Sequence, residues 1–193
     1  MKKNIINIGK EVINIENKGL KILAKSINNN FVKAIEILKK TKGRIILTGI
    51  GKSGIIANKI SSTLSSTGSP SQFIHPSEAS HGDLGMLSRK DSIVALTFSG
   101  KTNELNDIFF YSKKNKIPLI IITSKSSSNL KQVAKVCIEL SNLKEACPLG
   151  LTPTTSTTAM IALGDAIAIT LMKLKKFTQK DFYSLHPGGE LGK

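Results

Sequence analysis

The sequence predicts an α/β fold in which helices cover both faces of a parallel sheet of about five strands. Short apolar runs alternate with segments of helical periodicity along most of the chain. The first run, residues 44–48, leads into a glycine-rich turn and then into a helical segment over residues 56–64. Fully apolar strands separated by helices are typical of a parallel sheet that is buried on both faces. We therefore expect three layers, with the sheet in the middle.

The segment before the first strand is expected to form a helical arm. Between residues 9 and 40, apolar side chains recur every three to five positions, which indicates helix. The polar residues 28–30 interrupt this pattern and predict a break. We assign residues 1–42 to the arm, residues 43–176 to the α/β core and residues 177–193 to a C-terminal tail, all within a single domain.

The remaining elements of the core follow from the same alternation. The last long helix is predicted over residues 157–174, where apolar residues lie on most sides. Residues 182–193 contain three glycines and one proline and are expected to be irregular. The other predicted strands are residues 71–74, 92–97, 118–123 and 136–139.

The composition is that of a cytoplasmic, soluble domain. A chain of 193 residues can bury roughly 70% of its unfolded surface without a metal or a disulfide. No uninterrupted apolar stretch approaches the roughly 20 residues that cross a bilayer, and the first nine residues lack a secretory signal. The two cysteines, Cys137 and Cys147, are compatible with a reducing compartment. We expect no membrane partner.

The net charge of +15 raises the question of a nucleic-acid partner. The central residues 45–110, which hold most of the motifs, carry five basic and five acidic side chains and are neutral. Only Arg44 and Arg89 are arginines among the 28 basic residues, whereas base-reading sites favour arginine. We therefore expect no nucleic-acid partner, although the positive charge suits an anionic substrate.

The turn GIGKSG at residues 49–54 formally matches the dinucleotide pattern G-x-G-x-x-G. A dinucleotide site also needs an acidic residue after the second strand, but residues 71–74 run into His75. A Walker A loop would need glycine where Ile46 stands. The turn is thus a generic anion site at a helix N-terminus, where free N–H groups favour a phosphate. The alternative is that the glycines serve only a tight turn.

A second loop, TFSGKT at residues 97–102, follows the third predicted strand. The hydroxyls of Thr97, Ser99 and Thr102 and the backbone N–H groups of a helix start can cradle a phosphate. A helix cap rich in serine and threonine is the alternative. Because ligands bind beyond the carboxyl ends of parallel strands, we expect both loops to serve one pocket.

Six motifs then carry a family resemblance: GxGKSG, STGSPS, HPSEASHGDLGM, SGKTNE, KEACPLGLTPTTSTT and SLHPGGELGK. From about residue 10 to the end, the chain resembles the sugar isomerase (SIS) domain of bacterial arabinose-5-phosphate isomerases. The resemblance implies the SIS fold, a flavodoxin-like three-layer sandwich, and no cofactor. It also implies interconversion of D-arabinose 5-phosphate and D-ribulose 5-phosphate through an enediolate, which supplies Kdo for lipopolysaccharide.

Aldose–ketose isomerisation suits a carboxylate base, whose basicity partial burial can raise. The resemblance places Lys52, Glu104, Glu145 and His186 among the catalytic positions. We expect Glu145 to be the base and Glu104 a second acid-base or orienting group. His186 would act in ring opening or oxygen proton transfer, and Lys52 would stabilise the enediolate or phosphate charge. The expected substrate-binding residues are Ser53, Gly68, Ser69, His75, His81, Thr97, Ser99 and Thr102.

Several of these residues would also suit a purely structural role. Glu104 would fit the first turn of any helix, and Lys52 would fit a solvated surface. The spacing of His75 and His81 is no zinc pattern, so we expect no required metal, although His75 could contact an inhibitory zinc ion.

The tail that carries His186 is expected to complete a neighbour's pocket, and the resemblance implies a homotetramer with shared active sites.

Family members commonly continue into a tandem CBS pair, whereas this sequence ends at Lys193. They often have an acidic residue where Lys101 stands and asparagine where Phe98 stands, so specificity among sugar phosphates could differ. An isomerase of another sugar phosphate and a non-catalytic sugar-phosphate-binding regulator are the alternative functions.

Overall fold

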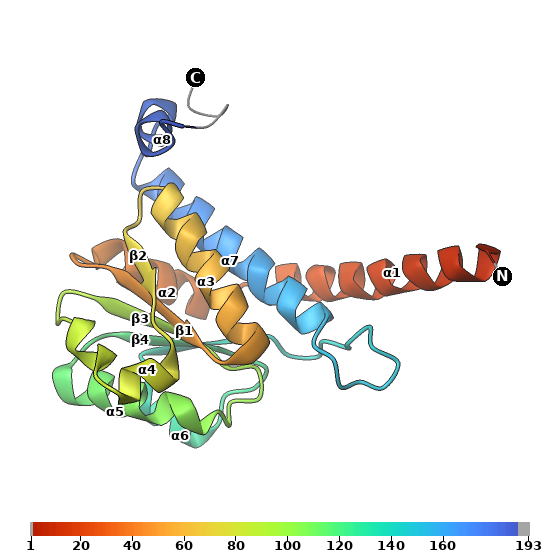
Figure 1. Cartoon of the computed structure of the whole chain (residues 1–193), viewed down its shortest axis with the longest axis horizontal. Helices are drawn as coiled ribbons and strands as arrows, with labels where there is room; N and C mark the ends of the chain where they lie inside the picture. The colour runs from red at the N-terminus through yellow and green to blue at the C-terminus, as the bar shows by residue number, and fades with distance from the viewer. Residues whose placement is uncertain (1, 189–193) are drawn as a thin grey trace.

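The computed structural model describes residues 2–188 and contains one five-stranded sheet in the order β2-β1-β3-β4-β5 (Figure 1). Every neighbouring pair of strands is parallel. The strands are β1 (Ile45–Gly49), β2 (Ser71–Phe73), β3 (Ser92–Leu96), β4 (Leu119–Thr123) and β5 (Val136–Glu139). Each lies within one residue of its predicted bounds. The prediction of a parallel α/β sheet is confirmed.

Helices cover both faces of this sheet and form the expected three layers (Figure 1). Successive strand residues point to opposite faces, so Ile45 and Leu47 join one core while Ile46 joins the other. On the first face lie α1 (Lys2–Ser26), α2 (Asn29–Lys40), α3 (Gly51–Ser66) and α7 (Thr155–Leu174). On the second face lie α4 (Pro76–Ser80), α5 (Asn106–Asn115) and α6 (Ser128–Val133), with 3-10 turns at Asp83–Met86 and Asn103–Leu105.

The arm consists of two helices that break at Asn28, as the sequence indicates. The Asn28 side chain caps α2 by accepting a hydrogen bond from the Asn30 N–H at 2.8 Å. Only the C-terminal half of α1 packs on the core, through Gly19 and Leu23. A Cβ at Gly19 would overlap the Thr155 side chain, so glycine lets α1 cross α7 closely. The N-terminal half of α1 projects away from the body (Figure 1).

Helices α3 and α7 run side by side in the same direction. Along their length, Ile60 packs on Gly164, and the Lys59 ammonium pairs with Asp165 at 2.5 Å. Both helices therefore begin at the edge where the strands end. A helix of 20 residues spans about 30 Å, so α7 carries the chain from that edge to the opposite one.

Helix α7 is also long and apolar enough to cross a membrane by length and composition, although the sequence holds no uninterrupted apolar run of that length. Threonine and serine interrupt its sequence without making it polar on average. Nine of its 20 residues are buried, where it packs against α1, α2 and α3. Its apolar character thus serves the first core.

The prediction of an irregular tail was wrong for residues 182–185, which belong to α8 (Gln179–Leu185). A capping box explains the helix: the Thr178 hydroxyl accepts from the Asp181 N–H, and the Asp181 carboxylate accepts from the Thr178 N–H at 2.7 Å. The glycine and proline content outweighed this signal in the sequence. Residues 189–193, the end of the predicted tail, lie outside the described residues.

Candidate active site

Three of the four predicted catalytic residues lie at the carboxyl edge of the sheet. Lys52 is on the first turn of α3, directly after β1, and Glu104 is on the 3-10 turn that follows the neighbouring strand β3. Glu145 lies in the loop between β5 and α7. Because α3 and α7 start side by side, the structure brings these residues to one edge. Glu104 precedes α5, so it is not on the helix itself.

The first turn has the features of an anion site. Gly51 has φ +58, and Ile50 at the N-cap of α3 provides no side-chain hydrogen bond, so the first N–H groups of the helix are free. A Cβ at Gly54 would lie 2.6 Å from the Gly49 carbonyl oxygen. This glycine lets the helix start close to the strand, which places Lys52 and Ser53 over the end of β1. Lys52 is exposed and Ser53 is half-buried.

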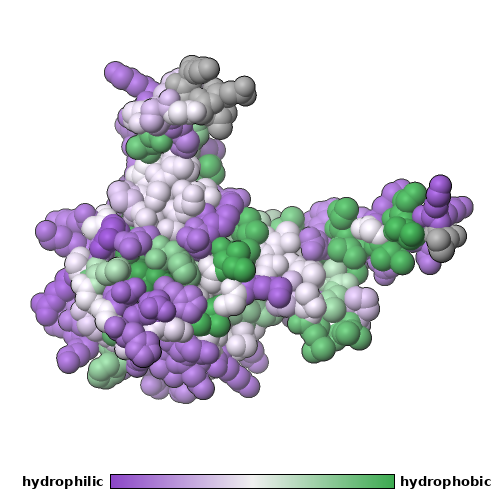
Figure 2. All heavy atoms as spheres, viewed as in Figure 1, coloured by the Kyte–Doolittle hydropathy of each residue, from purple (hydrophilic) through white to green (hydrophobic). Residues whose placement is uncertain are grey.

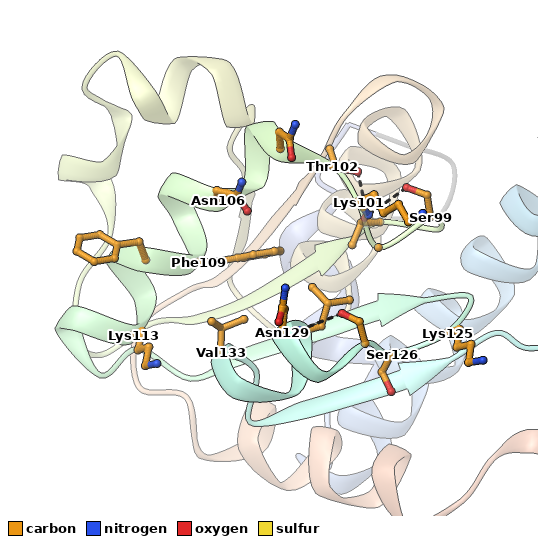
Figure 3. A pocket seen from close by; sticks show the side chains of 16 residues that line it. Ser99, Lys101, Thr102, Asn106, Phe109, Lys113, Lys125, Ser126, Asn129 and Val133 are labelled. Atoms are coloured by element: carbon orange, nitrogen blue, oxygen red, sulfur yellow. Dashed lines mark hydrogen bonds between the residues drawn. The ribbon is translucent and has the colours of Figure 1, made fainter.

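The second loop presents its hydroxyls next to a cavity of about 800 Å³ between α5 and α6 (Figure 3). Thr97 is buried, and its Oγ1 lies 2.8 Å from Oγ1 of Thr102 in a hydrogen bond. The Ser99 hydroxyl accepts from the Lys101 N–H at 3.2 Å, and Gly100 has φ +68. The loop thus offers hydroxyls and a lysine to an anion.

This cavity is not lined by residues of both loops, so it is not the single pocket that the sequence predicts. It extends from the second loop towards Phe109 and Lys113 on α5 and Val133 on α6 (Figure 3). No residue of the first turn lines it. Within one chain, the two loops share an edge of the sheet but not this cavity.

Glu145 is held at the N-terminus of α7. Its Oε2 accepts hydrogen bonds from the Thr154 N–H at 2.8 Å, the Thr154 hydroxyl at 3.0 Å and the Ser156 N–H at 3.3 Å. Burial by itself would raise the pKa of Glu145, but the hydrogen bonds from Ser156 and Thr154 outweigh it and hold the pKa below its ordinary value. Partial burial, which can raise the basicity of a carboxylate, therefore does not raise the net pKa of Glu145. The carboxylate is fully ionised at neutral pH.

Two buried hydroxyls at the same edge were not among the predicted site residues. Among residues 2–188, the side-chain oxygens of Thr48 and Thr155 are buried and have no hydrogen-bond partner. Thr48 is the penultimate residue of β1, and Thr155 is the first residue of α7. A buried hydroxyl without a hydrogen-bond partner costs about 1–3 kcal/mol of folding free energy. A water or ligand that hydrogen-bonds to Thr48 or Thr155 would remove this cost.

His75 and His81 flank the short helix α4, beside the turn that carries Glu104. The Nδ1 atom of His75 accepts from the Ser77 N–H at 3.3 Å, and both histidines are exposed. Helix α4 is tied to α5 by the Ser80 hydroxyl, which donates to Asp107 at 2.7 Å. The part of the chain that the structure describes contains no group of three or more metal-binding side chains.

Gly68 and Ser69 are not brought to this edge. They lie between the end of α3 and the start of β2, at the amino edge of the sheet. Ser69 is fully buried, and its hydroxyl accepts from the Lys175 ammonium at 2.8 Å. The structure therefore separates these two residues from the other predicted substrate contacts of the same chain.

His186 also lies far from Glu145 of its own chain. It follows α8, which stands beyond the C-terminal end of α7 (Figure 1). The Nδ1 atom of His186 lies 2.8 Å from the Phe182 carbonyl oxygen, and the two rings stack at 3.9 Å. Since a carbonyl only accepts, Nδ1 donates and Nε2 of the neutral ring is left as an acceptor.

Cys147 sits two residues after Glu145 in the same loop. Hydrogen bonds from the backbone of Thr152 and Leu151 lower the pKa of its thiol to about 7. Burial raises the pKa of Cys137 instead. The loop thus places a thiol of lowered pKa two residues from the expected base in the sequence.

Comparisons with known proteins assign the family. Residues 37–170 match the family described as SIS domain. The chain belongs to the SIS domain family. It is similar to a protein of E. coli CFT073 solved in complex with arabinose 5-phosphate, at 37% identity and a TM-score of 0.93. That match covers 97% of this chain and 100% of the other.

Curated SIS relatives are similar over nearly the whole chain. A protein named arabinose 5-phosphate isomerase from Yersinia pestis is 45% identical over 185 residues, which is 96% of this chain and 56% of the relative. One of the same name from Francisella tularensis is 46% identical over 191 residues, or 97% of this chain and 58% of the relative. The chain thus spans about half the length of the curated relatives it matches.

Proposed function

We propose that this SIS domain is an aldose–ketose isomerase that interconverts D-arabinose 5-phosphate and D-ribulose 5-phosphate. The observation that carries the proposal is the position of Lys52, Glu104 and Glu145 at one edge of the sheet, where two helix starts and a hydroxyl loop favour a phosphate. Relatives named arabinose 5-phosphate isomerase, and a structural match solved with that sugar phosphate, support the pentose phosphate as substrate.

The reaction moves two protons, one from C2 to C1 and one from O2 to O1, and requires no cofactor. Glu145 takes the proton from C2 of the open-chain aldose, and the electron pair moves to form C1=C2 while the carbonyl oxygen O1 becomes an oxyanion. Oε1 is the assigned base atom, because the hydrogen bonds from Thr154 and Ser156 are accepted by Oε2. Lys52 stabilises the enediolate charge. Return of the proton to C1, with loss of the O2 proton and protonation of O1, gives the ketose.

The remaining residues have supporting roles in this proposal. Ser53, Thr97, Ser99 and Thr102, together with the free N–H groups of α3, bind the sugar phosphate at the sheet edge that the two loops share, outside the cavity between α5 and α6. His75 and His81 contact sugar hydroxyls, and Glu104 orients the substrate or moves an oxygen proton. We place the enzyme in the cytoplasm, where it supplies Kdo for lipopolysaccharide.

A coupled assay with arabinose 5-phosphate, ribose 5-phosphate and glucose 6-phosphate, each with a chelator, tests the function. We expect turnover of arabinose 5-phosphate to ribulose 5-phosphate that the chelator does not abolish. Turnover of only another sugar phosphate would overturn the substrate. Failure with all three, by a folded and oligomeric sample, would overturn the enzyme.

We also propose that the active site is shared between copies of a homotetramer, with His186 supplied by a neighbouring chain. Its support is the length of α7, about 30 Å for 20 residues, because Glu145 lies at the N-terminal end of this helix and His186 lies beyond its C-terminal end. Figure 2 shows apolar side chains along the projecting arm of α1, where isolated exposure would be unfavourable. The exposed apolar residues of the N-terminal half of α1 and of the loop before α7 include Ile5, Ile6, Ile8, Ile13, Leu149 and Leu151.

Mixing two inactive variants tests this sharing. Glu145→Gln and His186→Asn should each be inactive alone, because every site then lacks one group. When the two variants are coexpressed, random assembly should restore about a quarter of wild-type activity. Half of the pairs then contain one chain of each variant, and one of the two sites in such a pair has both an intact Glu145 and an intact His186. Activity is measured on the purified mixed oligomer. An unrestored mixture that is assembled as in the wild type would contradict a shared site.

A further inference from the structure

The motif STGSPS holds Gly68 and Ser69, which the proposed chemistry leaves without a role in their own chain. They lie at the end of α3, at the amino edge of the sheet, whereas the site lies at the carboxyl edge. Both contact the segment that joins α7 to α8. These contacts within the chain explain why a glycine and a hydroxyl stand there.

Gly68 is fitted to the ring of Phe177. Its φ of +84 favours glycine, and a Cβ at this position would overlap Cδ2 of Phe177 and lie 2.6 Å from Cε2. The ring therefore rests directly on the glycine backbone. Substitution by alanine must displace Phe177 or distort the turn.

Ser69 holds Lys175, which lies two residues before Phe177 in the same segment. The Lys175 ammonium donates to the buried Ser69 hydroxyl at 2.8 Å and to the Gly68 carbonyl oxygen at 3.4 Å. Burial lowers the pKa of Lys175, so its charge is partly removed from water and directed to these acceptors. Two independent contacts thus fix the chain between Lys175 and Phe177.

The fixed segment leads without a flexible link to His186. Phe177 is followed directly by Thr178, whose capping box with Asp181 starts α8. A cavity of about 350 Å³ lies where Asp181, Ser184 and Leu185 of α8 face Gly68 and Phe177. At the far end of α8, Phe182 holds the His186 ring by stacking and by its carbonyl oxygen. The direction of His186 is therefore set by Gly68 and Ser69.

We propose that Gly68 and Ser69 are positioning residues that aim His186 into the active site of a neighbouring copy, an inference that rests on the shared site proposed above. They act in the chain that supplies the histidine. They have no role in the site of the chain whose Glu145 receives it. This asymmetry separates positioning from a general effect on folding.

The test places Gly68→Ala on one or the other chain of the complementing pair. In the restored site, His186 comes from the Glu145→Gln chain and Glu145 from the His186→Asn chain. Gly68→Ala on the Glu145→Gln chain should reduce the restored activity about a hundredfold, the effect of misplacing a catalytic group by about 1 Å. The same substitution on the His186→Asn chain should leave the restored activity within twofold, because its own tail is already inactive.

The outcomes separate the two proposals. Equal loss from both placements, or no loss from either, would overturn the positioning role while the shared site stands. If the pair without Gly68→Ala restores nothing, the shared site and the positioning role both fall. As a milder variant, Ser69→Ala in the wild-type background should lower kcat several-fold with KM within twofold, because the phosphate loops are untouched. A change in KM alone would contradict the role.

Discussion

Replacing Glu145 by glutamine is expected to lower kcat about a thousandfold, the typical contribution of a positioned general base. Glutamine keeps the size of the side chain and an oxygen that accepts from Thr154 and Ser156, so the loop is retained. Exchange of the substrate C2 hydrogen with deuterium from the solvent should fall equally, as measured by nuclear magnetic resonance. Sugar-phosphate binding should remain, because the phosphate loops are unchanged.

The matched control is Glu36→Gln, which removes the same charge from the exposed face of α2 and should leave kcat within twofold. Exchange that survives in Glu145→Gln at near the wild-type rate would assign the base elsewhere, with Glu104 the next candidate.

The same substitution should change stability in a pH-dependent way. The folded-state pKa of Glu145 is lowered, so the carboxylate stabilises the fold above the unfolded-state pKa of about 4.3 and loses this effect as pH falls through the folded-state pKa. The difference in unfolding free energy between wild type and Glu145→Gln should therefore shrink on acidification below about pH 4.3. A difference that grows on acidification would contradict the lowered pKa.

Replacing Gly54 by alanine is expected to disrupt the first turn and the fold around it. The added Cβ would lie 2.6 Å from the Gly49 carbonyl oxygen, and a backbone atom cannot rotate away. Helix α3 must shift from β1, at a cost of about 1–3 kcal/mol, which exceeds the roughly 1 kcal/mol that alanine gains over glycine in a helix. Because Lys52 and Ser53 move with the helix, kcat/KM should fall about a hundredfold.

Urea unfolding and the coupled assay measure the two effects. Gly85→Ala is the matched control, since a Cβ there meets no atom within 4 Å and should leave stability within about 0.5 kcal/mol. Equal stability and activity of Gly54→Ala and wild type would show that α3 does not depend on this close approach.

The strands and the carboxyl-edge loops could be predicted because they depend on local pattern. The short apolar run within residues 44–48, bounded by a glycine turn, predicts a strand covered on both faces, and the Gly-Ile-Gly-Lys-Ser turn then follows at its carboxyl end. Helix α8 was missed although its signal is local, because the capping box of Thr178 and Asp181 stands just before a stretch rich in glycine and proline.

The sequence by itself determined the parallel sheet, the two loops at its carboxyl edge and the acidic and basic groups that lie there. Only the tertiary structure decided that Glu145 has a lowered pKa, since the Thr154 and Ser156 donors reach it through the start of α7. Only the structure separated Gly68 and Ser69 from Glu145, because α3 carries the chain from the carboxyl edge of the sheet to the amino edge. Only the structure gave the extent of α7, about 30 Å, which lies between Glu145 and the tail that carries His186. The sequence motifs show which chemical groups the chain carries, but the distances between these groups depend on how the helices pack on the sheet.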